Sequence, residues 1–406
     1  MISKIKNIAE KIICKIYRNT IPNKVNEIRK KDKIRVLFIV SEASKWKTEY
    51  LYLAMRNHER FDPIIGITLK TDNKPSESAK SLLHLITYLK SKEYDYVELI
   101  REDFIKSCIK PDIIIYSEPY STTILRGFNY LHNLNCLFIS ITYGFHSVLL
   151  PFNHFGGIKD VAWFDCYEND STAEDAINYT KGKRSNILAT GLPMSEIFLK
   201  YKPAVNPWKN NDNRKRIIWA PHHSIGFDYE TITYGNFLKI AESMRQLSEK
   251  YKDKIYWAFK PHPLLKYKLE LIWGAEKTNE YYSYWQNSDH SQLEEGEYVD
   301  LFMQSDAMIH DCDTFTIEYL YANKPVIYFF NNANHNDNLN SFAKQAISVH
   351  YKGTQISDIE SFILNIIHEH DTLANERDWF YNNYLRIPQG INASENIINT
   401  ILYNNV

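Results

Sequence analysis

The sequence predicts two α/β domains, each built on a parallel β-sheet with helices on both faces. From Lys33 onward, short apolar runs alternate with amphipathic stretches, and the pattern stops at a polar stretch with two prolines before it restarts. Strands separated by helical patterns are typical of parallel sheets. The length of 406 residues agrees with two domains or three, because one domain usually has roughly 100–200 residues.

The first domain is expected over residues 32–201, after an N-terminal helix and linker at 1–31. Its apolar runs predict strands at Ile34–Val40, Ile64–Thr68, Ile113–Tyr116, Cys136–Thr142 and Ile187–Ala189. Amphipathic stretches between them predict helices near Lys45–Asn57 and Ala79–Lys90. A polar stretch at 202–214, which has prolines and no periodicity, is the expected interdomain linker.

The second domain is expected over residues 215–385. Its predicted strands are Ile217–Ala220, Ile255–Phe259, Ala307–Ile309 and Pro325–Phe329, and its predicted helices are Gly235–Tyr251 and Thr314–Ala322. The tail from Asp358 to Leu402 has a mostly helical pattern, and residues 386–406 are expected to form a separate C-terminal helix. Open α/β sheets bind ligands at the carboxyl ends of their strands, so both domains are expected to face a common cleft.

The composition excludes several classes of protein. The chain is 44% hydrophobic and 14% aromatic, which is too apolar for a disordered protein. Its 48 Lys and Arg residues balance 49 Asp and Glu residues, so there is no overall basic field and we expect no nucleic-acid partner. Five cysteines without C-x-x-C spacing favour reduced thiols in the cytoplasm over zinc or disulfides.

The charge is unevenly distributed along the chain. Residues 1–31 carry nine basic and two acidic residues, a balance of +7, which leaves −8 for the rest. This segment starts with a helical pattern in which isoleucines share one face and basic residues the other: Ile2, Ile5, Ile8, Ile12, Ile13 and Ile16 against Lys4, Lys11, Lys15 and Arg18. Two interpretations are open. Either the helix packs its stripe on its own domain, or residues 2–18 lie on an anionic membrane, where each basic residue adds about 1 kcal/mol.

No segment is expected to cross a membrane. Glu10 and Lys11 interrupt the apolar core that a secretory signal peptide would need, and no other apolar run reaches about 18 residues. We therefore expect a cytoplasmic protein. The second interpretation of the N-terminal helix would place it peripherally on the inner face of the cell membrane.

The strongest polar cluster is His-Asp-Cys-Asp-Thr-Phe-Thr-Ile-Glu at 310–318, directly after a predicted strand. Asp313 is placed as the N-cap of the next helix, with the hydroxyl of Thr314 in its first turn. A helix start offers N–H donors and a partial positive charge, which suit a phosphate or diphosphate. Glu318, one turn further, can accept hydrogen bonds from a ribose or polyol hydroxyl. A plain capped helix is the alternative.

Two other turns in the second domain carry histidines. The prolines of Lys260-Pro261-His262-Pro263 hold the backbone around His262, and an imidazole beside a lysine can neutralise charge on a phosphoryl oxygen. His222, His223 and Ser224 follow the strand at 217–220. Adjacent histidines point in different directions, so we expect these to donate to phosphate or base oxygens and not to share a metal ion.

The first domain offers candidates for a general base. His146 closes the segment after the strand at 136–142, and His154 lies just beyond it. Both are candidates because a base must reach the acceptor hydroxyl. The other acceptor-side candidates lie at the ends of two predicted strands: Ser41, Glu42, Tyr143 and Gly144. The chain has no G-x-G-x-x-G, P-loop, H-E-x-x-H or G-x-S-x-G motif, which argues against dehydrogenases, P-loop kinases, zincins and serine hydrolases.

Taken together, these clusters resemble the CDP-glycerol glycerophosphotransferase family of wall teichoic acid and capsule polymer synthesis. The likeness is carried by residues 305–327 (strand, turn, helix, then Lys-Pro-Val-Ile), by the Lys-Pro-His-Pro turn at 260–263, and by the strand ending in Ala-Pro at 217–223. In coarse order it covers residues 33–385. The resemblance implies a GT-B fold of two Rossmann-type domains, with the nucleotide donor on the second.

The resemblance also implies residue roles. His262 would contact the donor's diphosphate, and Glu318 falls on the family's later acidic position. Asp313 and Thr314 fall where the family has paired serines. The donor-binding candidates are completed by neighbours in the matched stretches: Lys260, Asp311, Phe315, His222, His223 and Ser224.

Two departures from the family pattern matter. A carboxylate at Asp313 repels a diphosphate unless it caps the helix or binds a hydroxyl, which leaves the donor's identity open. The family's His-Gly-Thr, which contains the base, reads Tyr143-Gly144-Phe145 here. The base is therefore His146, three places further on, or another residue.

The resemblance leads us to expect a transferase that moves a polyol phosphate, most simply glycerol phosphate, from a CDP-activated donor to a hydroxyl of a lipid-linked or growing cell-surface polymer, with release of CMP. His146 or His154 would be the base, and no metal ion or cofactor is expected. One alternative is a GT-B glycosyltransferase that uses a nucleotide sugar for capsule or lipopolysaccharide synthesis. Another is a non-catalytic binding subunit of a polymer-assembly complex.

Overall fold

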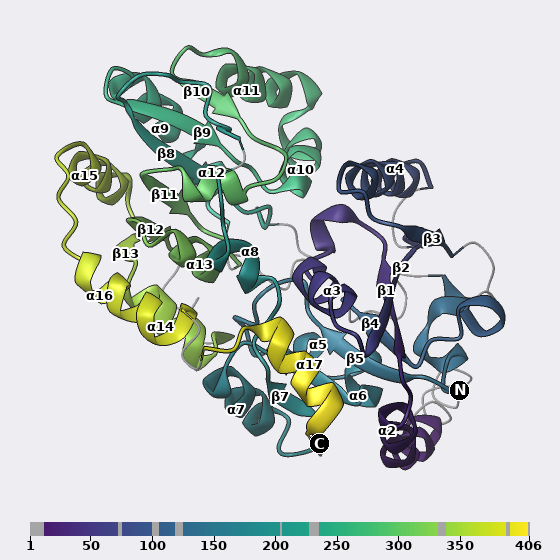
Figure 1. Cartoon of the computed structure of the whole chain (residues 1–406). Helices are drawn as coiled ribbons and strands as arrows, with labels where there is room; N and C mark the ends of the chain where they lie inside the picture. The colour runs from purple at the N-terminus through teal and green to yellow at the C-terminus, as the bar shows by residue number, and fades with distance from the viewer. Residues whose placement is uncertain are drawn as a thin grey trace, which may run out of the picture. The chain divides into compact units, whose positions relative to one another are not determined.

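The computed structural model describes residues 12–71, 75–99, 105–117, 125–203, 205–226, 235–312, 314–331, 338–386 and 390–404, and the structural statements below concern these residues. The chain forms two compact units, each with its own sheet (Figure 1). The first unit contains Met1–Glu196 together with Gln389–Val406, and the second contains Ile197–Pro388.

The sheet of the first unit has the strand order β3-β2-β1-β4-β5-β6-β7, and all neighbouring strands are parallel. Its strands are β1 (Ile34–Val40), β2 (Phe61–Ile67), β3 (Tyr96–Glu98), β4 (Ile113–Tyr116), β5 (Leu137–Ile141), β6 (Phe164–Tyr167) and β7 (Ile187–Ala189). Alternate side chains of β1 enter opposite layers, as the strand period of two requires. Leu37 and Ile39 belong to the same buried cluster as Tyr17, whereas Phe38 packs edge-on against Tyr52.

Helices flank this sheet. They are α2 (Ile21–Arg29), α3 (Glu49–Arg56), α4 (Pro75–Ser91), α5 (Pro151–His154), α6 (Ile158–Val161), α7 (Asp170–Tyr179) and α17 (Ala393–Tyr403), with helical residues also at 12–18. Shorter helical turns are η1 (Ala43–Lys45), η2 (Ile105–Ile109), η3 (Arg126–Phe128) and η4 (Tyr130–His132). α8 (Ser195–Leu199) spans the boundary between the units.

The sheet of the second unit has the strand order β10-β9-β8-β11-β12-β13 and is also parallel throughout. Its strands are β8 (Lys215–Ala220), β9 (Ile255–Phe259), β10 (Ser291–Leu293), β11 (Ala307–His310), β12 (Val326–Phe329) and β13 (Tyr351–Gly353). Its helices are α9 (Phe237–Lys250), α10 (Pro263–Trp273), α11 (Ala275–Asn287), α12 (Val299–Met303), α13 (Phe315–Glu318), α14 (Ser341–Ser348), α15 (Ile356–Ile367) and α16 (Ala374–Phe380). The helical turns η5 (Tyr319–Ala322) and η7 (Tyr381–Leu385) follow α13 and α16.

The two sheets have the same arrangement around the first strand of each unit. In the first unit β1 lies between β2 and β4, and in the second unit β8 lies between β9 and β11. This order is that of the doubly wound dinucleotide-binding fold, and such sheets bind ligands where the strand order reverses. In the first unit that point lies between β1 and β4, and in the second unit between β8 and β11. The predicted fold class of two parallel α/β sheets is therefore confirmed.

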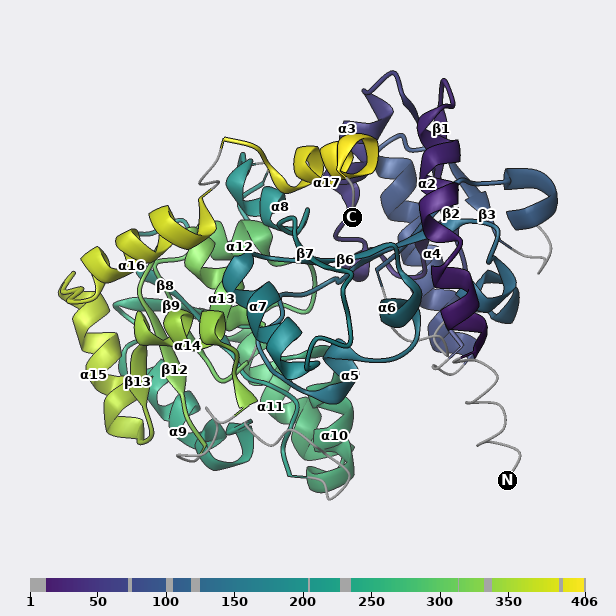
Figure 2. The ribbon, with the colours of Figure 1, turned by 90° about the horizontal axis from the view of Figure 1, so that it is seen from below.

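The end of the chain returns to the first unit. α17 lies beside α3 in both views (Figures 1 and 2). The guanidinium of Arg29 donates to the carbonyls of Thr400 and Ile401, and Glu196 accepts from the backbone N–H of Ser394 at 2.8 Å. The segment predicted as a separate C-terminal helix at 386–406 is thus a layer of the first unit.

The segment predicted as a linker, 202–214, belongs to the second unit. Trp208 is buried, and the backbone N–H of Lys209 donates to the side chain of Gln292 at 2.9 Å. The prolines exclude regular structure from this segment, but its polar groups find partners on β10. The boundary between the units lies earlier, at Glu196.

Half of the apolar stripe expected at the N-terminus, namely Ile2, Ile5 and Ile8, lies outside the described residues. Within the described part, Ile12, Ile13 and Ile16 are 54%, 40% and 61% exposed. The helix instead packs through Tyr17, whose hydroxyl donates to the carbonyl of Cys136 at 2.8 Å. Among the described residues, no helix is both long and apolar enough to span a membrane.

Candidate functional site

Three histidines meet at the carboxyl ends of β8 and β9 in the second unit. The backbone N–H of His262 donates to the carbonyl of Pro221 at 3.1 Å, which joins the two turns that follow these strands. The ring centroids of His222 and His223 are 4.2 Å apart, and those of His223 and His262 are 4.1 Å apart. The prediction that the adjacent histidines diverge was wrong, because the backbone leaves the extended conformation after β8 and both rings turn toward His262.

The hydrogen bonds of two of these rings fix where their protons lie. Nδ1 of His222 accepts the backbone N–H of Ser224 at 3.1 Å, and Nδ1 of His262 accepts that of Leu264, also at 3.1 Å. A backbone N–H can only donate, so each neutral ring carries its proton on Nε2. Burial lowers the pKa of His262 to about 3, and nearby positive charges act in the same direction. The ring is therefore neutral at pH 7.

The third ring is held by a lysine. Nζ of Lys268, on α10, donates to Nδ1 of His223 at 2.8 Å and approaches its carbonyl at 3.2 Å. An ammonium group has no acceptor, so His223 also carries its proton on Nε2. Lys260 adds a second buried ammonium group, whose Nζ donates to the carbonyl of Gly296 at 2.8 Å. Three imidazole N–H donors and two cations suit an anion such as a diphosphate.

The same three histidines are near enough for a metal ion, since one ring nitrogen of each lies within 4.8 Å of the others. The hydrogen bonds argue against that use. A metal-bound Nε2 normally leaves a proton on Nδ1, which then donates to its outer partner. Here Nδ1 of His222 and of His262 faces a backbone N–H, and Nδ1 of His223 faces an ammonium group. The donor set therefore fits an anion better than a cation.

Asp311, which follows β11, holds the backbone of the turn that contains His222. Its buried carboxylate accepts the backbone N–H of His222 at 2.7 Å and that of Asn236 at 2.5 Å. Burial raises the pKa of Asp311 to about 7, although these N–H groups favour the charged form. Gly235 completes the support, because a Cβ there would lie 2.5 Å from the carbonyl oxygen of Ser224. Asp311 thus positions the donor site and does not line it directly.

The segment after β11 differs from its prediction. Asp313, the predicted N-cap, lies outside the described residues. Thr314 precedes α13, which has only four residues before it tightens into η5, and the side chain of Thr314 makes no capping hydrogen bond. Phe315 packs against Tyr298, with ring centroids 5.4 Å apart. Glu318 is buried (1% exposed).

Tyr298, which the sequence analysis did not identify, contacts both Glu318 and Lys260. Burial raises its pKa, and the charge and hydrogen bond of Glu318 raise it further. The ammonium group of Lys260 lies 5.7 Å from the centre of its ring. The predicted role of Glu318 as a direct ligand of a polyol hydroxyl is not supported, because the carboxylate is directed into the protein. Its partner is Tyr298.

In the first unit, His146 pairs with a carboxylate that sequence reasoning missed. Glu168, one residue beyond β6, accepts the backbone N–H of His146, and its oxygens lie 3.1 and 3.2 Å from Nδ1 of the ring. An ionised carboxylate only accepts, so Nδ1 carries the proton and Nε2 the lone pair. The ring stacks on Tyr167 at 4.1 Å. This is the protonation state that a general base needs.

His154 does not meet the requirements for a base. It is fully buried (0% exposed), and both ring nitrogens have partners: Nδ1 lies 3.0 Å from the hydroxyl of Tyr167, and Nε2 lies 3.2 Å from the carbonyl of Val148. Burial lowers its pKa to about 3. His154 therefore supports the stacked rings, and His146 is the remaining histidine candidate.

Two of the other acceptor-side candidates, Glu42 and Tyr143, contact lysine side chains. Glu42, after β1, forms ion pairs with Lys45 at 3.6 Å and with Lys70 at 3.2 Å. Burial alone would raise the pKa of Glu42, but the two ammonium groups outweigh it and lower the pKa. Nζ of Lys45 also lies 5.0 Å from the ring centre of Tyr143. Ser41 is buried and Gly144 is half-buried beside them in sequence.

Four site residues were thus missed, and each is far in sequence from the residue that it supports: Glu168, Asn236, Lys268 and Tyr298. A weak signal existed for Glu168, which directly follows a short apolar run, as strand-end site residues do. Lys268 and Asn236 lie on or beside helices with no distinguishing pattern. Only the fold brings Lys268 to His223 and Asn236 to Asp311.

Comparison with known proteins identifies the family. The model of the CDP-Glycerol:Poly(glycerophosphate) glycerophosphotransferase family matches residues 174–403, which is more than half of the chain and includes the whole second unit. The chain belongs to this family. It is therefore a transferase of the CDP-glycerol glycerophosphotransferase type, as the sequence resemblance implied. No curated protein matches the sequence.

Solved structures show that the fold is shared more widely. A histidine variant of the wall teichoic acid polymerase TagF is similar with a TM-score of 0.60 and 13% identity, over 98% of this chain and 96% of that chain. Another TagF variant, soaked with CDPG, has a TM-score of 0.57 and 15% identity over 98% and 95%. UDP-GlcNAc 2-epimerase from Neisseria meningitidis, bound to UDP-GlcNAc, has a TM-score of 0.59 and 15% identity over 92% and 100%. The GT-B-like fold is therefore confirmed.

Proposed function

We propose that the enzyme transfers a polyol phosphate, most simply glycerol phosphate, from a CDP-activated donor to a hydroxyl of a lipid-linked or growing cell-surface polymer such as wall teichoic acid. The observation that carries the proposal is the set of three Nε2–H donors at His222, His223 and His262, with two ammonium groups beside them. Such a set suits a diphosphate. The family match and the CDPG soak of a related fold support cytidine as the nucleotide.

In the proposed reaction, the acceptor oxygen attacks the phosphorus that carries the polyol. The bond from that phosphorus to the bridging oxygen breaks, and CMP leaves with the electron pair. The acceptor proton passes to Nε2 of His146, and Glu168 stabilises the imidazolium that results. The imidazole donors and the ammonium groups of Lys260 and Lys268 hold the charge that develops on the phosphoryl and leaving oxygens. No metal ion or further cofactor enters the proposal.

The side chain of His146 is only 4% exposed, so the acceptor must uncover the ring before proton transfer. Hydrogen bonds of catalytic groups often tighten only in the substrate complex. The proposal therefore requires that binding of the acceptor changes the surroundings of His146, while the pair with Glu168 is retained.

Product analysis tests the reaction. The enzyme is incubated with an acceptor polymer and with CDP-glycerol, CDP-ribitol or a panel of UDP-sugars, and the released nucleotide is identified. We expect CMP from a CDP-polyol. Release of UDP from a sugar donor alone would instead establish a glycosyltransferase, because attack at an anomeric carbon leaves the diphosphate intact. Consumption of no donor, by protein shown to be folded, would favour a non-catalytic binding subunit.

The second part of the proposal is peripheral contact with the inner face of the cell membrane. It is supported by the exposed Ile12, Ile13 and Ile16 on a basic helix, which suits the boundary between lipid headgroups and acyl chains. We expect Ile12→Asp/Ile16→Asp to lower co-sedimentation with phosphatidylglycerol vesicles by about tenfold or more. Leu83→Asp, at an equally exposed position (65%) on α4, is the matched control. Unchanged co-sedimentation of the double variant would refute membrane contact through this helix.

A further inference from the structure

A cavity of about 430 Å³ lies against the helix at 12–18 in the first unit. None of the candidate catalytic residues is among the residues that line it. It is lined by the helix, by Tyr130 of η4, by the loop after α5 together with Asp160 of α6, and by the turn before β7. The residues that matter for its chemistry are Lys15, Arg18, Asp160, Lys183 and Arg184.

The cavity is cationic. Four positive side chains face a single carboxylate, that of Asp160. Lys15 and Lys183 are exposed and Arg18 is half-buried, so their charges are available to a ligand from solution. Arginine presents planar N–H groups that match phosphate oxygens, and lysine adds a point charge. This combination selects an anion with several oxygen acceptors.

Arg184 supplies a second, independent observation. Its side chain is 2% exposed, and its terminal nitrogens donate to Asp165 at 2.9 Å and to the carbonyl of His154 at 2.8 Å. Nε of Arg184 is buried and has no hydrogen-bond partner among the described residues. Asp165 is shared with the buried Lys159 at 3.3 Å, so it serves two cations. A buried donor without an acceptor is costly, and an anion in the cavity would provide one.

The surroundings of the cavity decide which anion it takes. The helix that contributes Lys15 and Arg18 also bears the exposed Ile12 and Ile16, and Phe155 on the cavity wall is 37% exposed. Apolar side chains beside a cationic cavity suit a molecule with a phosphate head and an acyl tail. A free phosphate or nucleotide gains nothing from these side chains.

We propose that this cavity binds the phosphate headgroup of an acidic membrane lipid. The inference deepens the proposed membrane contact and rests on it. Arg18, Lys183 and Arg184 hold the phosphate, while the isoleucines of the helix enter the lipid surface. A lipid phosphate bound in the cavity fixes one point of the first unit at headgroup depth. The site therefore sets the orientation of the enzyme on the bilayer, in addition to increasing its affinity for the bilayer.

Calorimetric titration with a soluble short-chain lipid tests the site without a membrane. Dihexanoyl phosphatidic acid, dihexanoyl phosphatidylcholine and inorganic phosphate are each titrated into the full-length protein. We expect phosphatidic acid to bind at least about tenfold more tightly than either of the others. Equal binding of inorganic phosphate would overturn the lipid assignment, and equal binding of phosphatidylcholine would overturn the need for an anionic headgroup.

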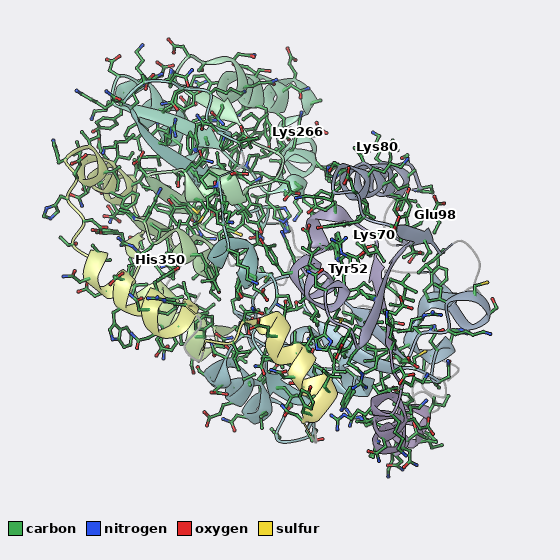
Figure 3. All side chains as sticks on the ribbon, viewed as in Figure 1. Tyr52, Lys70, Lys80, Glu98, Lys266 and His350 are labelled. Carbon is green, nitrogen blue, oxygen red and sulfur yellow. The ribbon has the colours of Figure 1, made fainter. Side chains whose placement is uncertain are left out.

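A charge-matched pair of variants locates the site. Arg18→Gln/Lys183→Gln removes two cavity charges, and Lys80→Gln/Lys90→Gln removes two from the exposed face of α4, where Figure 3 labels Lys80. We expect the first variant to weaken phosphatidic acid binding by about tenfold or more and the second to change it less than about twofold, with equal thermal unfolding of both. Equal losses in both variants, or no loss in the first, would refute the cavity as the site. The titration needs no turnover, so this result is independent of the proposed transfer reaction.

Discussion

His262 of the second unit and His146 of the first unit carry their protons on opposite ring nitrogens. In the second unit, Nδ1 of His262 accepts the backbone N–H of Leu264, which leaves a proton on Nε2. In the first unit, Nδ1 of His146 faces the carboxylate of Glu168, which leaves a lone pair on Nε2. The same side chain is thus an N–H donor in one unit and a base in the other. The outer partner of each ring, and not the histidine itself, sets its chemistry.

The largest expected effect is the loss of the base. We expect His146→Ala to lower kcat by about 10²–10⁴-fold, because a positioned base contributes that much to proton transfer, while the KM for CDP-glycerol stays within about twofold. His84→Ala, at an exposed histidine on α4, is the control. Initial rates of CMP release measure both. A kcat within a few-fold of wild type would show that another group accepts the proton.

The loss of one donor in the second unit should come next. We expect His262→Ala to lower kcat/KM for the donor by about 10²–10³-fold, as for removal of one N–H from an oxyanion site. His262→Gln, which can keep an N–H, should recover part of the loss, and the exposed His368→Ala should be silent. No recovery by glutamine would contradict the donor role of Nε2. The assignment of His262 as an N–H donor in the second unit would then be wrong.

Removal of the negative charge of Glu168 tests whether this carboxylate makes His146 a base. A carboxylate beside an imidazole stabilises its protonated form. We expect Glu168→Gln to lower kcat at pH 8 by about tenfold, because the imidazolium that forms during proton transfer loses the carboxylate that stabilises it. An unchanged kcat would show that Glu168 does not act on the base.

The lysine behind His223 is the corresponding test in the second unit. We expect Lys268→Met to weaken donor binding by about tenfold, because the ring then loses the ammonium group that fixes its proton on Nε2 and the site loses one positive charge. Lys266→Met, on the same helix and labelled in Figure 3, is the matched control, since this lysine lies over Tyr282 instead. Titration with CDP measures both variants. Equal affinities would remove Lys268 from the site.

The smallest effect concerns stability and not activity. His350 follows α14 (Figure 3), where its Nδ1 donates to the carbonyl of Ala346 at 2.8 Å, and burial lowers its pKa to about 3. Below pH 6.5 the imidazole of residue 350 therefore binds a proton in the unfolded chain but not in the folded chain. The contribution of this group to the free energy of unfolding is fully present above pH 6.5 and decreases as the pH falls. At pH 5.5 this costs about 1.4 kcal/mol, or roughly 3–6 °C in a unit of this size.

His350→Asn keeps an N–H donor and removes the titration, so we expect its thermal midpoint to fall less than that of wild type between pH 7.5 and 5.5. The exposed His370→Asn is the control. Asp311 acts with the opposite sign, because its pKa of about 7 destabilises the fold as the pH rises toward 7, but it is common to all three proteins and cancels. Parallel curves for wild type and His350→Asn would refute the assigned titration.

The sequence was sufficient to predict those strands of the two sheets that are apolar on both faces. Ile34–Val40 and Ile255–Phe259 are β-strands with the predicted bounds, because buried parallel strands are continuous apolar runs. Phe164–Tyr167 was missed since an aspartate interrupts it; that aspartate, Asp165, is paired with Lys159 and Arg184 inside the protein. Ser291–Leu293 was missed because it is a short edge strand with little apolar character.

The site was predictable only in part, for a related reason. A histidine at a strand end is visible in the sequence, so His222, His262 and His146 were found. The atom that carries the proton depends on a partner brought close by folding: Glu168 for His146, and Lys268, which is 45 residues from His223 in the chain. Burial also cannot be read locally. Glu318 has the pattern of a ligand and His154 that of a base, yet both side chains are internal.

The return of α17 to the first unit has a consequence for synthesis of the chain on the ribosome. The second unit, Ile197–Pro388, is continuous and can fold as soon as it has emerged. The first unit cannot close until residues 393–403 have been added, because Glu196 and Arg29 bind the backbone of that helix. At roughly 5–20 residues per second, the α/β sheet that is made first waits about 10–40 s with the α3 side of its core uncovered. In this chain the domain that begins first is the last to be completed.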